Sequence, residues 1–399
     1  MRPLSQSACL RARQHVLSDI DRHAAGSCLP RGSRHPAKTS DLPWVNFSVT
    51  ACQVICSSAA RHCRRKCCTL TAEEWVARAT LVFGNGLGMA LDPTFFSLDN
   101  AIGRTWEDSV ALDEPTKDLV RYCLSDEGDR PHGEDDLDDL QLVVSACDFL
   151  SRTGSGELHW LSDDGKRFPE AVRKFLYQTS LYFHRRDSGL PMDFITSLVD
   201  YSKKTKSHVA TLNYDNLLYQ PMIKEEVLDG YNGALVDGFL RNGFAEDNLE
   251  RKYGRDFGYY MHLHGSPLFV DRDDGDRDKK VIKLRQAELG TDQDITGSHI
   301  VLTHVKHKET VIAASRLLTC YWEHFAKALE ESESAVLVGY SGCDRHLNSL
   351  LSARGPSKIR VVEWDGAGQK ESRQDFWNTL LGHEVHLVRL NNILKFTDW

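Results

Sequence analysis

The chain has 399 residues, of which 41% are hydrophobic and 27% charged, and its formal net charge is −8. These proportions are typical of a soluble globular protein and exclude a membrane-embedded chain, because no apolar run approaches the roughly 20 residues of a spanning helix. The acidic balance also argues against direct nucleic-acid binding, which needs a basic surface.

Residues 1–70 differ in composition from the rest of the chain. They carry nine Arg and two Lys against three Asp, a net charge of +8, and seven of the eleven cysteines. They show neither helical nor strand periodicity, so we expect a disordered segment or an extension translated from a start placed too far upstream. A zinc site among the crowded cysteines and an organellar transit peptide are the alternatives. Residues 71–399 would form the folded domain.

The first predicted strand is the short apolar run Thr80–Phe83, which ends in a glycine-rich turn before a helical pattern. Such a turn brings the backbone close to a pyrophosphate, although glycines are also common wherever a strand bends sharply into a helix. The candidate cofactor-binding residues of this turn are Gly84, Asn85, Gly86 and Gly88.

Residues 98–206 separate the first strand from the second and show helical periodicity over Asp135–Ser151 and Ala171–His184. We predict a helical insertion domain there. Further apolar runs with helical segments between them, such as Thr310–Glu331, predict a doubly wound, mainly parallel, Rossmann-like α/β sheet. The predicted strands after the first are His208–Leu212, Tyr260–His264, Ala335–Gly339, Ile359–Trp364 and Glu384–Leu390.

Asn213 and Asp215 directly follow the second strand, at the edge where open α/β sheets bind ligands. Asp215 also has the right chemistry to cap a helix over Asn216–Ile223, and Asn213 to satisfy a turn. For Asp215 the two roles are compatible, and for Asn213 we favour function.

Two histidines, His262 and His264, alternate along the third predicted strand, so they point to opposite faces. A histidine inside a strand is usually a core residue, whereas His264 stands at the strand end before Gly265. His264 is therefore the candidate base near neutral pH, and His262 the structural residue.

The fourth polar strand end is Gly339-Tyr340-Ser341-Gly342-Cys343-Asp344. Gly339, Ser341 and Asp344 are candidates for contact with ribose or phosphate, although a helix cap with packing glycines explains the same residues. A further polar segment, Asp271–Lys280, lacks the terminal glutamate and the flanking helices of a calcium loop, so we expect a charged hairpin tip and no metal site.

Together these four motifs resemble those of the sirtuin-like family in the same order, and most closely its bacterial antiphage-defence branch. The resemblance covers about residues 81–390, with Asn213-Tyr214-Asp215 and His264-Gly265-Ser266 its most specific parts. It implies that NAD lies across the carboxyl edge of the sheet with its phosphates at the glycine turn. Asn213 would position the nicotinamide ribose and the attacking water, His264 would act as general base, Asp215 would support the nicotinamide side, and Glu363 would meet the adenosine ribose.

The implied activity is cleavage of NAD to nicotinamide and ADP-ribose by an antiphage effector in the cytoplasm. The chain lacks the CxxC pairs of protein-deacetylating sirtuins after His264, which makes a deacylase the weaker alternative. The other alternative is a module that binds NAD or ADP-ribose without turnover and regulates a partner. Because uncontrolled NAD loss would kill its host, we also expect a homo-oligomer or a sensor partner, such as an ATPase or an Argonaute-like factor.

Overall fold

The computed structural model describes residues 77–108, 112–124, 129–153, 161–186, 189–272, 280–285, 288–289, 299–302 and 307–399. All of them belong to one compact unit, Leu70–Trp399. The predictions made for residues 1–70 lie outside the described residues.

The centre of the fold is a seven-stranded sheet with the order β11-β10-β9-β1-β2-β6-β3. Every neighbouring pair is parallel, and all six predicted strands belong to this sheet, which confirms the α/β, Rossmann-like prediction. The strands are β1 (Ala79–Phe83), β2 (His208–Thr211), β3 (Leu235–Val236), β6 (Gly258–His262), β9 (Ser334–Val338), β10 (Lys358–Trp364) and β11 (His386–Leu390).

Both faces of the sheet are covered, because all five residues of β1 are buried. The hydroxyl of Thr80 donates to the carbonyl of Ala328, which lies in helix α10 (Arg316–Glu331). Phe83 is an odd number of positions away and so faces the other side, where its ring centroid lies 6.0 Å from that of Trp399. Helix α10 therefore covers one face and the C-terminal segment the other.

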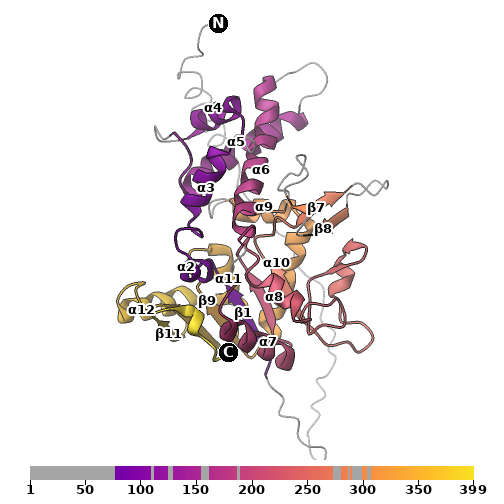
Figure 1. The fold of residues 1–399 in the computed structure, drawn as a ribbon, viewed down its shortest axis with the longest axis vertical. Coiled ribbons are helices and arrows are strands. Elements are labelled where there is room, and N and C mark those ends of the chain that lie inside the picture. The colour runs from indigo at the N-terminus through magenta and orange to yellow at the C-terminus, as the bar shows by residue number, and fades with distance from the viewer. Residues whose placement is uncertain are drawn as a thin grey trace, which may run out of the picture. The chain divides into compact units, whose positions relative to one another are not determined.

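Helices fill the long connection between β1 and β2. Four of them, α3 to α6, pack against one another around a hydrophobic cluster that includes Trp106 and Phe175 (Figure 1). The helical character of the connection is confirmed, while its status as a separate insertion domain stays a prediction. The helices are α2 (Gly86–Leu91), α3 (Leu98–Glu107), α4 (Glu114–Cys123), α5 (Glu134–Thr153), α6 (Asp163–His184) and α7 (Met192–Thr205).

Shorter elements complete the described part of the chain. The expected charged hairpin is seen as the antiparallel pair β7 and β8, while residues 273–279 at its tip lie outside the described residues. Within that described part, no helix has the length and apolar composition needed to cross a membrane. The remaining elements are α8 (Tyr219–Lys224), β4 (Phe239–Leu240), β5 (Gly243–Phe244), η1 (Glu246–Leu249), β7 (Phe269–Arg272), β8 (Lys280–Lys283), α9 (Lys308–Ala314), α11 (Arg345–Arg354), α12 (Lys370–Leu381) and η3 (Ile393–Lys395).

Three predicted helical segments have different limits in the structure, and the one over Ala171–His184 belongs to the longer α6. The pattern over Thr310–Glu331 is divided between α9 and α10, because Ser315 is extended and its hydroxyl accepts a hydrogen bond from the Leu318 N–H as an N-cap. The helix predicted from residue 216 begins at Tyr219. The carboxylate of Asp215 accepts the Leu217 N–H at 3.0 Å and so closes a turn ahead of the helix.

Candidate active site at the carboxyl edge of the sheet

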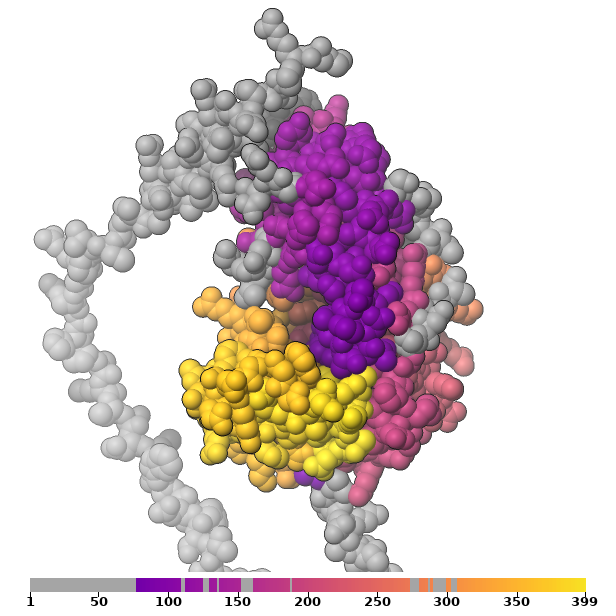
Figure 2. Space-filling model, turned by 60° about the vertical axis from the view of Figure 1, so that its left-hand side comes forward, coloured from indigo at the N-terminus to yellow at the C-terminus, as the bar shows by residue number. Residues whose placement is uncertain are grey.

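The carboxyl ends of the central strands surround a pocket of about 900 Å³. It lies at the end of β1, which pairs with β2 on one side and with β9 on the other. Open α/β sheets bind ligands at such a position. In Figure 2 the indigo segment that follows β1 lies next to the yellow C-terminal segment. The predicted site residues that line this pocket are Gly84, Asn85, Gly86, Asn213, Asp215, His264, Gly339, Ser341, Asp344 and Glu363.

The glycine turn after β1 packs directly on the backbone of the turn after β9. The Gly84 N–H donates to the Val338 carbonyl at 3.0 Å, and the Gly86 N–H to the Gly339 carbonyl at 2.9 Å. A Cβ atom at Gly86 would lie 2.6 Å from the Gly339 backbone, so a side chain is excluded there. Gly88 is not among the lining residues, and its missing Cβ leaves room for the ring of Phe96. Close packing alone thus accounts for Gly86 and Gly88.

Asn213 is held in one orientation at the end of β2. Its backbone N–H donates to the Thr211 hydroxyl at 3.1 Å, and its Nδ2 donates to the Gly84 carbonyl at 3.2 Å. The side-chain Oδ1 is buried and has no hydrogen-bond partner. An unsatisfied buried acceptor of this kind costs about 1–3 kcal/mol, so it requires a reason.

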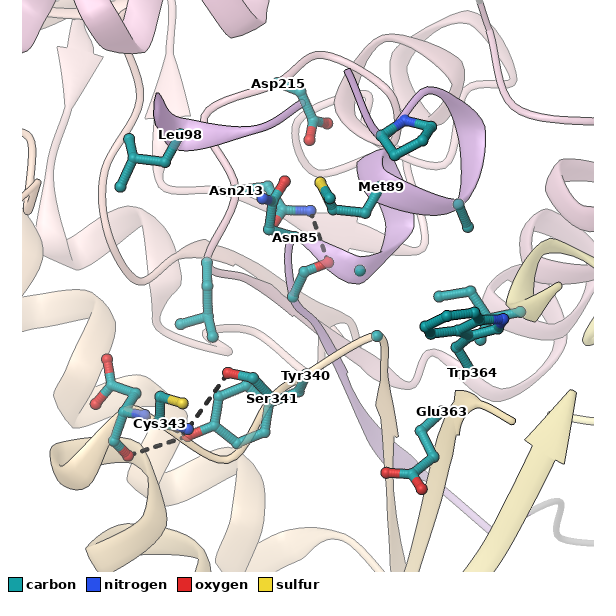
Figure 3. A pocket seen from close by; sticks show the side chains of 18 of the residues that line it. Asn85, Met89, Leu98, Asn213, Asp215, Tyr340, Ser341, Cys343, Glu363 and Trp364 are labelled. Carbon is teal, nitrogen blue, oxygen red and sulfur yellow. Dashed lines mark hydrogen bonds between the residues drawn. The ribbon is translucent and has the colours of Figure 1, made fainter. Parts of the chain in front are cut away.

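Asp215 lies next to Asn213 on the same side of the pocket, as Figure 3 shows. The residue is 8% exposed, and burial raises the pKa of its carboxyl to about 6. The hydrogen bond from Leu217 opposes this shift without cancelling it. Asp215 therefore changes charge close to neutral pH.

His264 forms a buried pair with Asp344. Its Nε2 lies 2.8 Å from Asp344 Oδ2, and the other carboxylate oxygen accepts the Leu347 N–H at 3.0 Å, which caps α11. Burial disfavours the charged form of Asp344, but the hydrogen bond from His264 and the charge of Lys308 hold its pKa well below the usual range. Asp344 is thus ionised, and we assign the proton of neutral His264 to Nε2.

This assignment places the basic lone pair of His264 on Nδ1. Burial, followed by the charge of Lys308, lowers the pKa of His264, although Asp344 opposes the shift. The imidazole is therefore neutral at physiological pH and able to accept a proton. A carboxylate that orients a histidine in this way is a common feature of general-base catalysis.

Lys308 connects this pair to the helical region. Its Nζ lies 3.4 Å from Asp344 Oδ2 and 3.7 Å from Oε2 of Glu134, which is the first residue of α5. The Lys308 side chain is only 6% exposed. The catalytic candidate His264 is therefore coupled to α5 through two ion pairs that share one ammonium group.

His262 occupies the opposite face of β6, as predicted. It is buried among aromatic rings, with centroids 4.9 Å from Tyr219 and 5.2 Å from Phe269, and it does not line the pocket. Burial lowers the pKa of His262 to about 3, so it stays neutral. This is the structural residue of the two.

Glu363 lines the other side of the pocket, beside the exposed Trp364 (Figure 3). Its Oε2 accepts from Arg373 and Trp377, and its Oε1 lies 3.3 Å from Nε of Arg389, a contact without hydrogen-bond geometry. The acid predicted to face a ribose is thus already engaged by two arginines.

Sequence reasoning missed several residues of the pocket. Glu134, Lys308 and Arg373 come from helices far from any strand-end motif, and nothing in their local sequence distinguishes them from surface charges. Tyr340 lay within a motif that we singled out only for its glycines, Ser341 and Asp344. Its hydroxyl donates to Asn348 at 2.8 Å and accepts the Asp344 N–H at 2.9 Å, which fixes the loop.

The sequence matches no protein-family model and no curated protein. Among the described residues, no group of three or more His, Cys, Asp or Glu side chains is arranged to hold a metal ion. The site consists of a neutral histidine held by an ionised carboxylate, an oriented asparagine and a second carboxyl near its titration point. These groups can activate water and stabilise positive charge on a bound ligand.

Proposed function

We propose that the chain is a sirtuin-like NAD glycohydrolase, which uses water to cleave the bond between nicotinamide and ribose. The observation that carries the proposal is that His264, oriented by Asp344, shares one pocket with Asn213, whose buried Oδ1 has no partner. The pocket volume of about 900 Å³ lies within the range of small-molecule sites and suits an extended dinucleotide.

The reaction breaks the carbon–nitrogen bond, and its electron pair passes to the nicotinamide ring, which leaves as a neutral molecule. Positive charge develops on the ribose, as it does on the sugar in glycoside hydrolysis. Water then bonds to the anomeric carbon, and its proton passes to Nδ1 of His264. The products are nicotinamide, ADP-ribose and one proton.

The other polar groups of the pocket have distinct roles in this proposal. Oδ1 of Asn213 accepts a hydrogen bond from a ribose hydroxyl or from the attacking water, which gives this orphaned acceptor its partner. Asp215, ionised above about pH 6, favours the positive charge that develops on the ribose. The turns at Gly84–Gly86 and Gly339–Ser341 face the diphosphate.

We also propose the biological setting that the resemblance implies. The chain would act in the cytoplasm as an antiphage effector whose NAD cleavage starts when infection is sensed. Restraint would come from self-assembly or from a partner protein, such as an ATPase or an Argonaute-like factor. The contact of Lys308 with Glu134 offers a physical route by which α5 influences the Asp344–His264 pair.

The test is release of nicotinamide and ADP-ribose from NAD by the purified full chain. We expect equimolar products, a loss of roughly 100-fold or more in His264→Ala and in Asn213→Ala, and no change in the exposed controls His386→Ala and Asn232→Ala. Thermal melting checks that each variant is folded.

Three other outcomes would replace the proposal. Equal release by the His264 variant would show that the pocket is not the catalytic site. NAD binding without release, unchanged in the same variant, would support the binding module. Turnover that requires an acyl-lysine peptide would identify a deacylase.

A further inference from the structure

At the end of the pocket near β10, two arginines contact one buried carboxylate, and Arg373 is the one of the two that lines the pocket. Oε2 of Glu363 accepts from Nε of Arg373 at 3.0 Å, from Nη2 of Arg373 at 2.9 Å and from the Trp377 indole at 3.0 Å. Its Oε1 lies 3.3 Å from Nε of Arg389, and Glu363 is only 4% exposed. The group as a whole therefore carries a net charge of +1.

An acidic residue at the end of such a strand can hold a ribose by accepting its hydroxyl hydrogens. Glu363 cannot do this as it stands, because three donors occupy one oxygen and the other is buried beside Arg389. Its carboxylate instead fixes the position of Arg373. Glu363 is thus a positioning residue, and Arg373 is the group offered to a ligand.

Arg373 retains donors for such a ligand. It lies in the first turn of α12, lines the pocket and stacks over Phe376, with its guanidinium carbon 4.4 Å from the ring centroid. Two of its five N–H groups donate to Glu363, and no described residue accepts a hydrogen bond from the other three. Arg389 differs, since its Nη2 donates to the carbonyls of Asp365 and Gly368 and so closes the loop after β10.

The charges of the pocket are arranged unequally. Asp344 is paired with His264 and Lys308 in one part of the pocket, which Asp215 also lines, whereas the cationic lining group at the β10 end is Arg373, with Arg389 beside the other oxygen of Glu363. A dinucleotide has a cationic nicotinamide at one end and anionic phosphates along the rest. The proposed orientation, with nicotinamide at Asn213 and His264, therefore brings the adenosine ribose toward Arg373.

We propose that Arg373 binds a phosphate on the 2′ position of the adenosine ribose, so that the preferred dinucleotide is NADP. Arginine suits this task because its planar guanidinium donates in pairs to phosphate oxygens, and it accommodates a 2′-phosphate in related strand-end sites. The inference rests on the proposed function for the identity of the ligand as a nicotinamide dinucleotide. It requires only the adenosine half for its test.

The test compares two adenosine probes that carry the same number of phosphates in different places. Adenosine 2′,5′-bisphosphate and ADP are titrated separately into the full chain, and their affinities are measured by calorimetry. We expect the 2′-phosphorylated probe to bind at least about 10-fold more tightly, because a charge-assisted pair is formed only with it. Equal affinity, tighter binding of ADP, or no binding of either probe would overturn the proposal.

Variants locate the preference on Arg373. Arg373→Met should abolish it, Arg373→Lys should retain part of it, and the exposed control Arg354→Met should retain all of it. A preference that survives in folded Arg373→Met overturns the assignment. Should that variant unfold, Arg373→Lys decides, because full retention there would mean that guanidinium geometry has no role.

The two proposals fail separately. Nicotinamide release from NAD combined with equal affinity for both probes leaves the hydrolase standing and overturns the phosphate site. A probe preference that depends on Arg373, in a protein that releases no nicotinamide from NAD or NADP, supports the phosphate site and contradicts the hydrolase.

Discussion

The two edges of the central sheet differ in whether their polar side chains are satisfied by other groups of the protein. At the amino ends of the strands, Arg78 and Arg251 lie within 3.5 Å of the Glu331 carboxylate, the buried His208 Nε2 lies 2.6 Å from it, and Asp256 pairs with Arg78. At the carboxyl ends, Asn213 has an acceptor without a partner, and burial raises the pKa of Asp215 to about 6.

This difference separates residues that support the fold from residues that are available for chemistry. The pairs around Glu331 hold the starts of β1, β2 and β6 together, so their charges are neutralised by the protein itself. At Asn213, in contrast, the buried Oδ1 has no hydrogen-bond partner in the protein, and a ligand could supply one. The carboxyl edge also contains charged pairs such as His264–Asp344, so what distinguishes it is the unpartnered Oδ1 of Asn213 and the raised pKa of Asp215.

The largest effect on activity is expected when the charged partner of His264 at the carboxyl edge is replaced by a neutral one. Asp344→Asn keeps an oxygen that can cap α11 but removes the charge that orients His264. We expect nicotinamide release to fall roughly 100-fold to 1000-fold. Because the buried ion pair with Lys308 is also broken, we expect a loss of about 3–5 kcal/mol in the free energy of unfolding, so thermal melting must confirm that the assayed variant is folded. A variant with full activity would contradict the role of the His264–Asp344 pair.

The amino edge should respond in stability and not in activity. Glu331→Gln leaves Arg251 and buried His208 without their carboxylate, and we expect a loss of about 2–3 kcal/mol in the free energy of unfolding. The value is at the low end for a buried pair because the Glu331 side chain is 33% exposed and partly screened. Urea denaturation measures it.

The neighbouring Glu330→Gln is the matched control for this change. Glu330 forms an exposed pair with Arg354, so its loss should cost less than about 0.5 kcal/mol. Equal losses in the two variants would mean that the cluster around Glu331 adds nothing beyond a surface ion pair.

Asp215→Asn should stabilise the fold while it impairs catalysis. The pKa of Asp215 is raised from 3.8 to about 6 in the folded chain, so stability from the protonated form is fully present below about pH 4 and is lost as the pH rises through about 6. At about pH 8 we expect the variant to be more stable by about 1–2 kcal/mol.

The pH dependence is what tests this explanation. The stability difference between Asp215→Asn and the parent should disappear below about pH 4, where the parent carboxyl is protonated in both states. A difference of the same size at every pH would mean that packing, not ionisation, is responsible.

Lys308→Met should have the smallest effect, a shift in the pH profile. The ammonium of Lys308 lowers the pKa of His264, so its removal should raise that pKa and move the acid limb of activity to higher pH. The exposed Lys327→Met serves as control. An unchanged or downward-shifted limb would contradict the coupling.

The apolar runs predicted six of the seven strands of the sheet, because a strand buried on both faces has few other sequences available to it, whereas the two-residue β3 is too short to give such a pattern. The positions of Asn213 and His264 after strands also predicted that the two residues share one pocket, since parallel strands bring their carboxyl ends to one edge. Gly88 was predicted with the phosphate turn, but it lies inside α2 against Phe96, where its small size serves packing.

Partners across the fold could not be predicted in the same way. The contact between His264 and Asp344 joins residues 80 positions apart, and its formation depends on how α11 meets β6. Arg373 and Lys308 reach the pocket from helices whose exposed faces are also charged, so residue type alone does not distinguish them. Such contacts depend on tertiary geometry.

The backbone contact of Gly84 and Gly86 with Gly339 has a consequence for engineering this fold. Substitution of any of the three should disturb the junction of β1 and β9 itself, so a mutational scan would record lost expression there and not a selective loss of turnover. Ligand preference can instead be redesigned at Ser341, Trp364 and Arg373. Their side chains can change without altering the backbone of the turns after β1 and β9. The scaffold and the recognition surface of this pocket can therefore be varied independently.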